Sequence, residues 1–227
     1  MPQVTFAPRC RRVPRSATLQ AVSPLVFLPG AGGRAAFWKP VADRLSDLGP
    51  AHLVAYPGFG DLPADPSVRS LDDLYRWLVA RLPSGRCHLV AQSMGGVLAA
   101  RLAVERPGRV DRLVLCATSG GVDVRRLGGA EWRDGFRAAR PEVPDWFELD
   151  RTDLTGRLGA IGAPTLLLWS DIDPVGPPAV GRFLTARVPG SRLVTIAGGS
   201  HAFAAERPDE VAPHLRAHLT PAVASGA

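Results

Sequence analysis

A serine at position 93 lies in the segment Ala91-Gln92-Ser93-Met94-Gly95, between an apolar run and a run with helical spacing. A nucleophile exposed on a tight strand-to-helix turn needs small residues two positions before and after it, as in the pattern G-x-S-x-G. Ala91 and Gly95 meet that need, although alanine replaces the usual first glycine. Serine is also a favoured helix N-cap. The segment therefore predicts an activated serine, with helix capping as the alternative.

A serine hydroxyl is a weak nucleophile until a base lies within hydrogen-bond reach. The five histidines are His52, His88, His201, His214 and His218. The first two begin apolar runs and are expected to be structural. The last two lie four residues apart on one face of the expected C-terminal helix, where a solvated face is more plausible than a metal site without a third ligand. His201 follows Gly198-Gly199-Ser200, a flexible loop that can hold an imidazole over a sheet edge, so we predict it as the base.

The base needs a carboxylate on its other ring nitrogen to fix its tautomer and orientation. Two aspartates compete for this role in the loop after the fifth apolar run, and a solvated turn is the simpler explanation for both. Asp171 comes directly after the run, whereas Asp173 lies farther into the loop before Pro174. We therefore predict Asp173 as the acid and keep Asp171 as the alternative. The chain order serine, aspartate, histidine is that of hydrolases with a strand–serine–helix turn.

An attacked carbonyl carbon produces an oxyanion, which needs two preorganised donors. The N–H of Met94, directly after the serine, is one candidate. The other should come from the glycine-rich turn Pro29-Gly30-Ala31-Gly32-Gly33, where we predict the N–H of Ala31, with Gly32 as the alternative. An ordinary glycine turn is the simpler explanation for this segment.

Apolar runs alternate with amphipathic segments along the chain, and this alternation would position those residues. The strands are expected at 25–28, 52–56, 87–91, 110–116, 165–169 and 192–196, and the helices at 37–48, from Ser70 onward, at 94–106, 178–188 and 209–219. Continuously apolar strands that alternate with helices predict an α/β fold, with a mostly parallel sheet and helices on both faces. An edge hairpin is expected from 4–6 and 19–22.

The 227 residues, 46% of them hydrophobic, fit a single domain over 1–227 with a reduced cap insert at about 117–160. No stretch approaches the roughly 20 apolar residues of a membrane span. The basic N-terminus is not followed by the apolar run of a leader. The three cysteines, Cys10, Cys87 and Cys116, match no metal motif, and Cys87 and Cys116 lie in apolar runs, where we expect buried reduced thiols. We expect a cytoplasmic protein with no membrane partner and no cleaved leader.

The net charge of +6 and the pI of about 10.2 raise the question of nucleic acid. The basic residues are nearly all arginines, which are scattered along the chain among acidic residues, and no aromatic–basic module is present. We therefore expect a solvated surface and no nucleic-acid partner.

From about residue 24 to 219 the chain resembles the α/β-hydrolase family. The resemblance rests on the turns Leu28-Pro29-Gly30-Ala31-Gly32 and Tyr56-Pro57-Gly58-Phe59-Gly60, the serine segment, Arg106-Pro107-Gly108 and Gly199-Ser200-His201. Within the family it is similar to small carboxylesterases, including pimeloyl-carrier-protein methyl ester esterases. Pro29 stands where many members have histidine.

The resemblance implies a serine hydrolase that cleaves a carboxylic ester through a Ser93–His201–Asp173 triad and an acyl-enzyme, without a cofactor or metal. The substrate would be a small ester or acyl compound, free or carrier-bound, in an open pocket lined by Met94, Trp132, Trp146, Val175 and Phe203. Packing of the cap is the simpler role for each tryptophan. Serine in the nucleophile position argues against relatives known for aspartate there, haloalkane dehalogenases and epoxide hydrolases. A lyase or synthase that uses the same triad, and a silent ligand-binding protein, remain as alternatives; the sequence is silent on oligomeric state.

Overall fold

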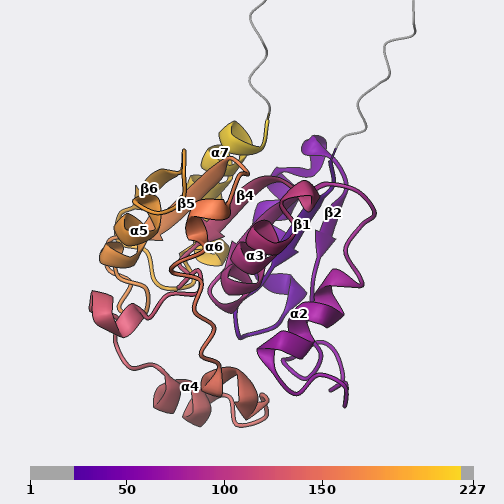
Figure 1. Cartoon of the computed structure of the whole chain (residues 1–227), viewed down its shortest axis with the longest axis vertical. Coiled ribbons are helices and arrows are strands. Elements are labelled where there is room, and N and C mark those ends of the chain that lie inside the picture. The colour runs from indigo at the N-terminus through magenta and orange to yellow at the C-terminus, as the bar shows by residue number, and fades with distance from the viewer. Residues whose placement is uncertain (1–22, 221–227) are drawn as a thin grey trace, which may run out of the picture.

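The computed structural model describes residues 23–220, and within them six parallel strands form one sheet (Figure 1). Their order is β2-β1-β3-β4-β5-β6. The strands are β1 (Leu25–Leu28), β2 (Ala51–Leu53), β3 (Cys87–Gln92), β4 (Val110–Cys116), β5 (Thr165–Ser170) and β6 (Arg192–Ile196). The predicted α/β fold with a parallel sheet is confirmed. The hairpin expected from 4–6 and 19–22 lies outside the described residues.

Helices cover both faces of the sheet, because alternate residues of each strand point to opposite sides. Val26 and Leu28 of β1 belong to one apolar cluster, whereas Leu25 and Phe27 belong to the other. The first cluster packs against α2 (Leu71–Val79), α3 (Met94–Glu105) and α5 (Pro178–Thr185). The second packs against α1 (Lys39–Arg44), α6 (Phe203–Glu206) and α7 (Pro208–Leu219).

Three predicted elements are shorter than expected. The helix expected at 178–188 is α5, which ends at Thr185. The helix expected at 37–48 is reduced to α1, flanked by two 3₁₀ turns, Ala35–Phe37 and Ser46–Leu48. The strand expected at 52–56 ends at Leu53, since Tyr56 N–H donates to Gly33 O in the first loop instead of continuing the ladder. The cap expected at Ser70 is present, because Ser70 Oγ accepts a hydrogen bond from Asp73 N at 3.0 Å.

The segment between β4 and β5 carries α4 (Arg133–Ala139) and several 3₁₀ turns, and it lies beside the carboxyl ends of the strands (Figure 1). An aromatic cluster joins it to the loop after β2. The rings of Phe136 and Phe59 lie 5.2 and 5.6 Å from the ring of Phe147, and Trp132 stacks on Phe147 at 5.7 Å. Arg140 Nη2 also donates to Phe59 O at 3.1 Å. Aromatic pairs of this kind add to the apolar burial that holds the insert on the body.

Cys87 and Cys116 are buried free thiols, as predicted. Burial raises the pKa of Cys87 to about 11, so this thiol stays protonated and unreactive at neutral pH. Cys10 lies outside the described residues.

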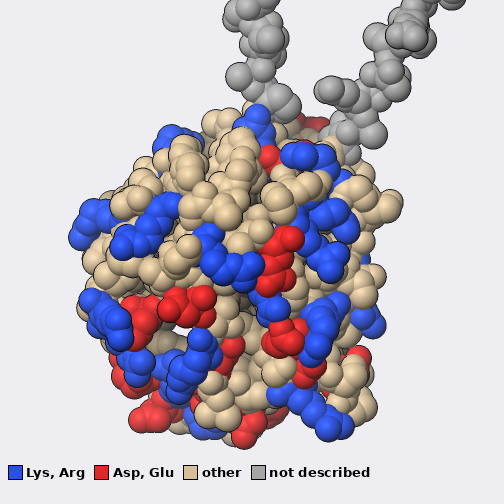
Figure 2. Space-filling view, in the orientation of Figure 1, with Lys and Arg blue, Asp and Glu red and all other residues tan. Residues whose placement is uncertain are grey.

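The described part of the chain is much less basic than the whole. Four arginines lie in residues 1–22 and all acidic residues lie within 23–220, so this part carries only two of the six net positive charges. Figure 2 shows basic and acidic side chains interspersed over the visible face, as expected of a solvated surface. None of the helices in residues 23–220 combines the length and the apolar character needed to cross a membrane.

The prediction that His218 lies on a solvated helix face is wrong. Its Nε2 lies 3.1 Å from Leu113 O, because this face of α7 packs against the sheet. Burial lowers the pKa of His218 to about 4, so the ring is neutral at pH 7. Within residues 23–220, no group of three or more His, Cys, Asp or Glu side chains could hold a metal ion.

The low pKa of His218 makes folding stability depend on pH. The unfolded chain, in which histidine titrates near about 6.5, binds more protons between pH 4 and 6.5 than the folded chain. The contribution of His218 to the free energy of unfolding is therefore complete above about pH 6.5 and is lost as the pH falls toward 4. Glutamine keeps a donor for Leu113 O and does not titrate. We expect His218→Gln to reduce the loss of unfolding free energy between pH 7 and 5 by about 1–2 kcal/mol, allowing for partial solvent screening.

Urea denaturation at both pH values measures this difference. His52→Gln is the matched control, since His52 is exposed on the edge strand β2. An unchanged pH dependence in His218→Gln would contradict the assignment to His218.

Candidate active site

Ser93 lies on a strained turn between β3 and α3, with φ 50° and ψ −121°. Such a conformation costs non-glycine residues about 1–3 kcal/mol and persists only where surrounding contacts impose it. Ser93 N donates to Cys116 O at 3.1 Å, and Ser93 O accepts hydrogen bonds from Gly96 N and Thr118 Oγ1. The Ser93 side chain makes no capping hydrogen bond to α3. The capping alternative is therefore wrong, and the hydroxyl faces the cavity described below.

The glycines around this turn allow close contact between the end of β3, the start of α3 and the glycine-rich loop 29–33 that follows β1. A methyl group on Gly95 would lie 2.4 Å from Pro29 O, and one on Gly96 would lie 2.4 Å from Thr118 Oγ1. A methyl group on Gly30 would lie 2.9 Å from Ser93 Cβ. Both the helix start and the glycine-rich loop thus press directly on the serine turn, which explains the small residues in both segments.

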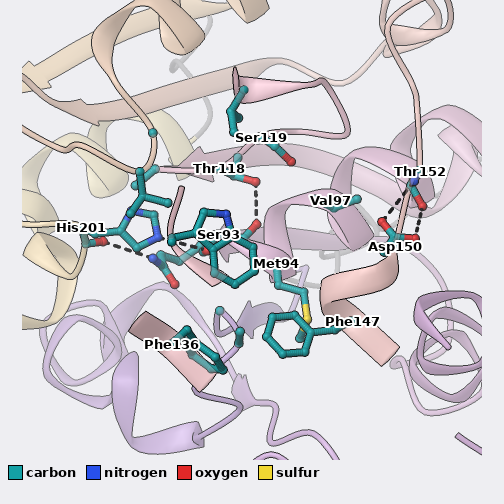
Figure 3. Close-up of a pocket in the computed structure, with 18 of the residues that line it drawn as sticks. Ser93, Met94, Val97, Thr118, Ser119, Phe136, Phe147, Asp150, Thr152 and His201 are labelled. Carbon is teal, nitrogen blue, oxygen red and sulfur yellow. Dashed lines mark hydrogen bonds between the residues drawn. The ribbon is translucent and has the colours of Figure 1, made fainter. Parts of the chain in front are cut away.

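His201 bridges the serine and an aspartate. Figure 3 shows the side chains of His201 and Ser93 side by side. Its Nε2 lies 3.1 Å from Ser93 Oγ, and its Nδ1 lies 2.7 Å from Asp173 Oδ2. Asp173 is buried, with 2% of its surface exposed. Burial alone would raise the pKa of Asp173, but the hydrogen bond and the charge of His201 outweigh it, with help from backbone N–H groups such as that of Val175, so the pKa lies below its ordinary value. The carboxylate is therefore ionised at neutral pH and can hold the Nδ1–H tautomer.

Asp171, the alternative acid, does not contact His201. It is exposed, and its Oδ1 accepts a hydrogen bond from Gly198 N at 2.6 Å. Beside this contact, Ser170 Oγ donates a hydrogen bond to Gly199 O. These two residues fasten the loop that carries His201 to the end of β5, while Asp173 meets the ring itself.

The two predicted oxyanion donors flank Ser93. Ala31 and Met94 both line the cavity that contains the serine hydroxyl. Neither N–H donates a hydrogen bond to any residue within 23–220. The Met94 N–H also belongs to the first turn of α3, where the helix dipole favours negative charge. Both groups are thus available to an oxyanion formed at the serine.

Two buried side chains support the loop that carries Ala31. The buried hydroxyl of Tyr56 donates to Pro29 O at 3.0 Å, and Trp38 Nε1 donates to Leu28 O at 2.9 Å. Sequence reasoning missed both contacts. Tyr56 heads the Tyr-Pro-Gly-Phe-Gly turn, and that motif was the available signal.

A cavity of about 1030 Å³ opens beside Ser93 and His201. Figure 2 shows the face hollowed above α4, with acidic and basic side chains at the rim. The apolar wall of the cavity includes three residues predicted from the sequence, Met94, Trp132 and Val175. It also includes five that were not predicted: Leu71, Val97, Val122, Phe136 and Phe147. Its charged lining, also unforeseen, consists of Arg34, Arg125, Arg126, Arg133, Arg151, Asp123, Asp150 and Asp153.

Two predicted pocket residues do not line this cavity. Trp146 packs edge-on against Phe59, with ring centroids 5.3 Å apart, and so anchors the insert. Phe203 is fully buried in the cluster on the opposite face of the sheet, although it follows His201 by only two residues. The short helix α6 turns it away from the cavity.

Comparisons with known proteins agree with this geometry. The model of the alpha/beta hydrolase family matches residues 25–214. The pimeloyl-[acyl-carrier protein] methyl ester esterase of Aeromonas hydrophila is 28% identical over 78% of this chain and 88% of that relative. The enol-lactonase of Burkholderia xenovorans has a TM-score of 0.72 at 21% identity, over 88% of this chain and 92% of that one. A thermophilic esterase of Thermogutta terrifontis has a TM-score of 0.68 at 22% identity, over 86% and 88%. At these identities the two structures show the shared fold alone.

Proposed function

Because the chain belongs to the alpha/beta hydrolase family, we propose that it is a serine hydrolase that cleaves carboxylic esters through an acyl-enzyme. One observation carries this proposal: Ser93 Oγ, His201 and buried Asp173 form an unbroken chain of contacts in one cavity. A serine that only stabilised the fold would need neither an imidazole on its hydroxyl nor a carboxylate behind that imidazole.

In the proposed reaction, Ser93 Oγ attacks the ester carbonyl carbon and its proton passes to His201 Nε2. The N–H groups of Ala31 and Met94 donate to the oxyanion, and Asp173 holds Nδ1–H and stabilises the imidazolium. His201 then gives its proton to the departing alcohol, which leaves the acyl group on Ser93. Water repeats the sequence and releases the acid.

The cavity wall indicates the kind of acyl group. The side chains nearest the serine along α3 are apolar, with Met94 first and Val97 one turn farther along (Figure 3). Leu71 and Phe147 extend this wall. We propose an apolar acyl chain longer than acetyl, on an ester that is free or carried by a protein. The carrier-bound methyl ester in the name of the Aeromonas relative supports the second possibility. A cytoplasmic location stays a prediction.

A panel of p-nitrophenyl esters from acetate to decanoate, together with methyl esters, tests the proposed activity. We expect saturable hydrolysis with a maximum beyond acetate. If fluorophosphonate labels the serine but no ester, thioester or lactone is turned over, the same triad serves a lyase or synthase instead.

Val97→Phe should shorten the preferred acyl chain. The added ring would fill the cavity one helical turn beyond Met94, where a longer chain would lie. We expect kcat/KM for octanoate to fall about 10- to 100-fold while that for acetate changes less than about threefold, because each excluded methylene is worth about 1–3 kcal/mol. Val97→Ala is the matched control and should leave the long esters as substrates. An equal loss for short and long esters in Val97→Phe would show that the chain does not pass Val97.

A further inference from the structure

Gln92 lies directly before Ser93, at the end of β3, and is 4% exposed. Its Nε2 donates to His201 O at 3.1 Å. Among the residues 23–220, Gln92 is the one donor to that carbonyl. The strand that bears the serine therefore holds the backbone of the residue whose ring contacts the serine.

The oxygen of the same amide lies close to Gly30, in the glycine-rich loop 29–33 that carries the Ala31 N–H and is called the oxyanion loop below. A methyl group on Gly30 would lie 2.3 Å from Gln92 Oε1 and 2.9 Å from Ser93 Cβ. The orientation of the amide is fixed, because a flipped amide would turn its oxygen toward His201 O and remove the only donor there. Gln92 thus spans the gap between the loop of the base and the loop of the oxyanion donors.

The loop that carries His201 is also held from α6, where Glu206 Oε2 accepts a hydrogen bond from Ser200 Oγ at 2.7 Å, and from the end of β5. Ser170 and Asp171 hold Gly199 and Gly198 from the end of β5, and Asp173 holds the ring from the loop after β5. None of these contacts relates His201 to β3. Within the described range 23–220, the contact from Gln92 is the one hydrogen bond between the backbone of His201 and the strand that precedes Ser93.

We propose that Gln92 is a positioning residue that sets the separation of Ser93 Oγ and His201 Nε2 and keeps the base loop in register with the oxyanion loop. This inference rests on the proposed hydrolase function. In each half-reaction His201 takes a proton and then returns it to a different oxygen, so the imidazole must stay in place while it is charged. A displacement of about 1 Å from the productive geometry lowers rates about 100-fold. Since Gln92 acts through His201, its loss should lower kcat more than it changes KM.

The test compares Gln92→Met with the wild-type chain. Methionine has nearly the length of glutamine and removes the donor. Thr165→Val is the matched control, because the Thr165 hydroxyl makes a buried hydrogen bond to Ala163 O at the opposite end of the sheet. We expect kcat for the best ester to fall about 30-fold in Gln92→Met with KM within about threefold. Thr165→Val should lose comparable thermal stability and keep kcat.

A second readout needs no turnover. Amide hydrogen exchange in 198–202 should be faster in Gln92→Met than in the wild type, and unchanged in Thr165→Val. If Gln92→Met does not fold, Gln92→Leu replaces it: a leucine side chain cannot donate to His201 O, so the same loss of kcat and faster exchange are expected.

Two results would overturn the proposal. The first is a kcat within about twofold of wild type with unchanged exchange in 198–202. The second is a parallel change of kcat and thermal stability in both Gln92→Met and Thr165→Val, which would indicate only a buried hydrogen bond. A wild-type chain that neither turns over esters nor reacts with fluorophosphonate would instead overturn the proposed function, and the exchange measurement would then decide the role of Gln92 separately.

Discussion

Ser93→Ala is expected to lower ester turnover by about 10⁶-fold while the chain stays folded. Removing the nucleophile of a triad leaves only the contribution of the oxyanion donors and of substrate binding. Alanine can occupy the strained turn as serine does, since the contacts that impose it run through the backbone of residue 93. The thermal midpoint should therefore move by no more than a few degrees.

Initial rates on the best p-nitrophenyl ester measure the loss of turnover. Absorbance gives the protein concentration, and circular dichroism shows that the variant is folded. Ser67→Ala is the control, because Ser67 is exposed and its hydroxyl donates a hydrogen bond to the nearby Asp65, away from the cavity. More than about 1% residual activity in Ser93→Ala would mean that another group performs the attack.

Asp173→Asn should lower kcat by about 10³- to 10⁴-fold with little change in KM. Asparagine has the same shape, but its amide can donate to Nδ1 and so stabilise the tautomer in which Nε2 carries the proton and cannot accept one from Ser93. It also loses the charge that stabilises the imidazolium. The effect should be large because Asp173 is buried, 2.7 Å from the ring.

Asp171→Asn is the matched control two residues away. Among residues 23–220, the Asp171 carboxylate accepts one hydrogen bond, from the N–H of Gly198. An amide oxygen can accept the same hydrogen bond, so kcat should fall less than about fivefold. Reversed magnitudes for the two variants would assign the acid to Asp171.

The positions of the loops that form the site could be predicted from the sequence, because the carboxyl ends of parallel strands lie at one edge of the sheet. Ser93, Asp173 and His201 each follow an apolar run, so an alternating α/β pattern brings their loops together. The strained conformation of Ser93 was also predictable, since the small residues around it leave room for it. The sequence alone could not decide which of Asp171 and Asp173 contacts His201, because both lie in one short loop after β5.

Which way a side chain points was harder to predict. Phe203 lies two residues from His201, yet it packs on the other face of the sheet because the chain begins a short helix there. Trp146 and Trp132 lie in the same insert, but only Trp132 reaches the cavity. The half-buried position of His218 depends on a carbonyl of β4 that is far away in the sequence.

Contacts from a side chain to a distant backbone atom could not be paired from the sequence, even where a motif such as Tyr-Pro-Gly-Phe-Gly marked one of the partners. Gln92 and His201 are 109 positions apart, and Tyr56 reaches Pro29 across 27. These contacts depend on how loops approach one another above the sheet. The elements and the reactive residues are therefore readable from the chain, whereas the residues that hold them in place required the structure.

Labelling with a fluorophosphonate probe, followed by peptide mapping by mass spectrometry, tests the activated serine most directly. The probe reacts with a serine hydroxyl whose proton is taken by a neighbouring base, whatever the natural ester is. We predict one adduct per chain, on Ser93, in the wild type and none in Ser93→Ala. A folded wild-type chain that carries no adduct, or carries it on a different serine, would contradict the assignment of Ser93, His201 and Asp173 as a working triad.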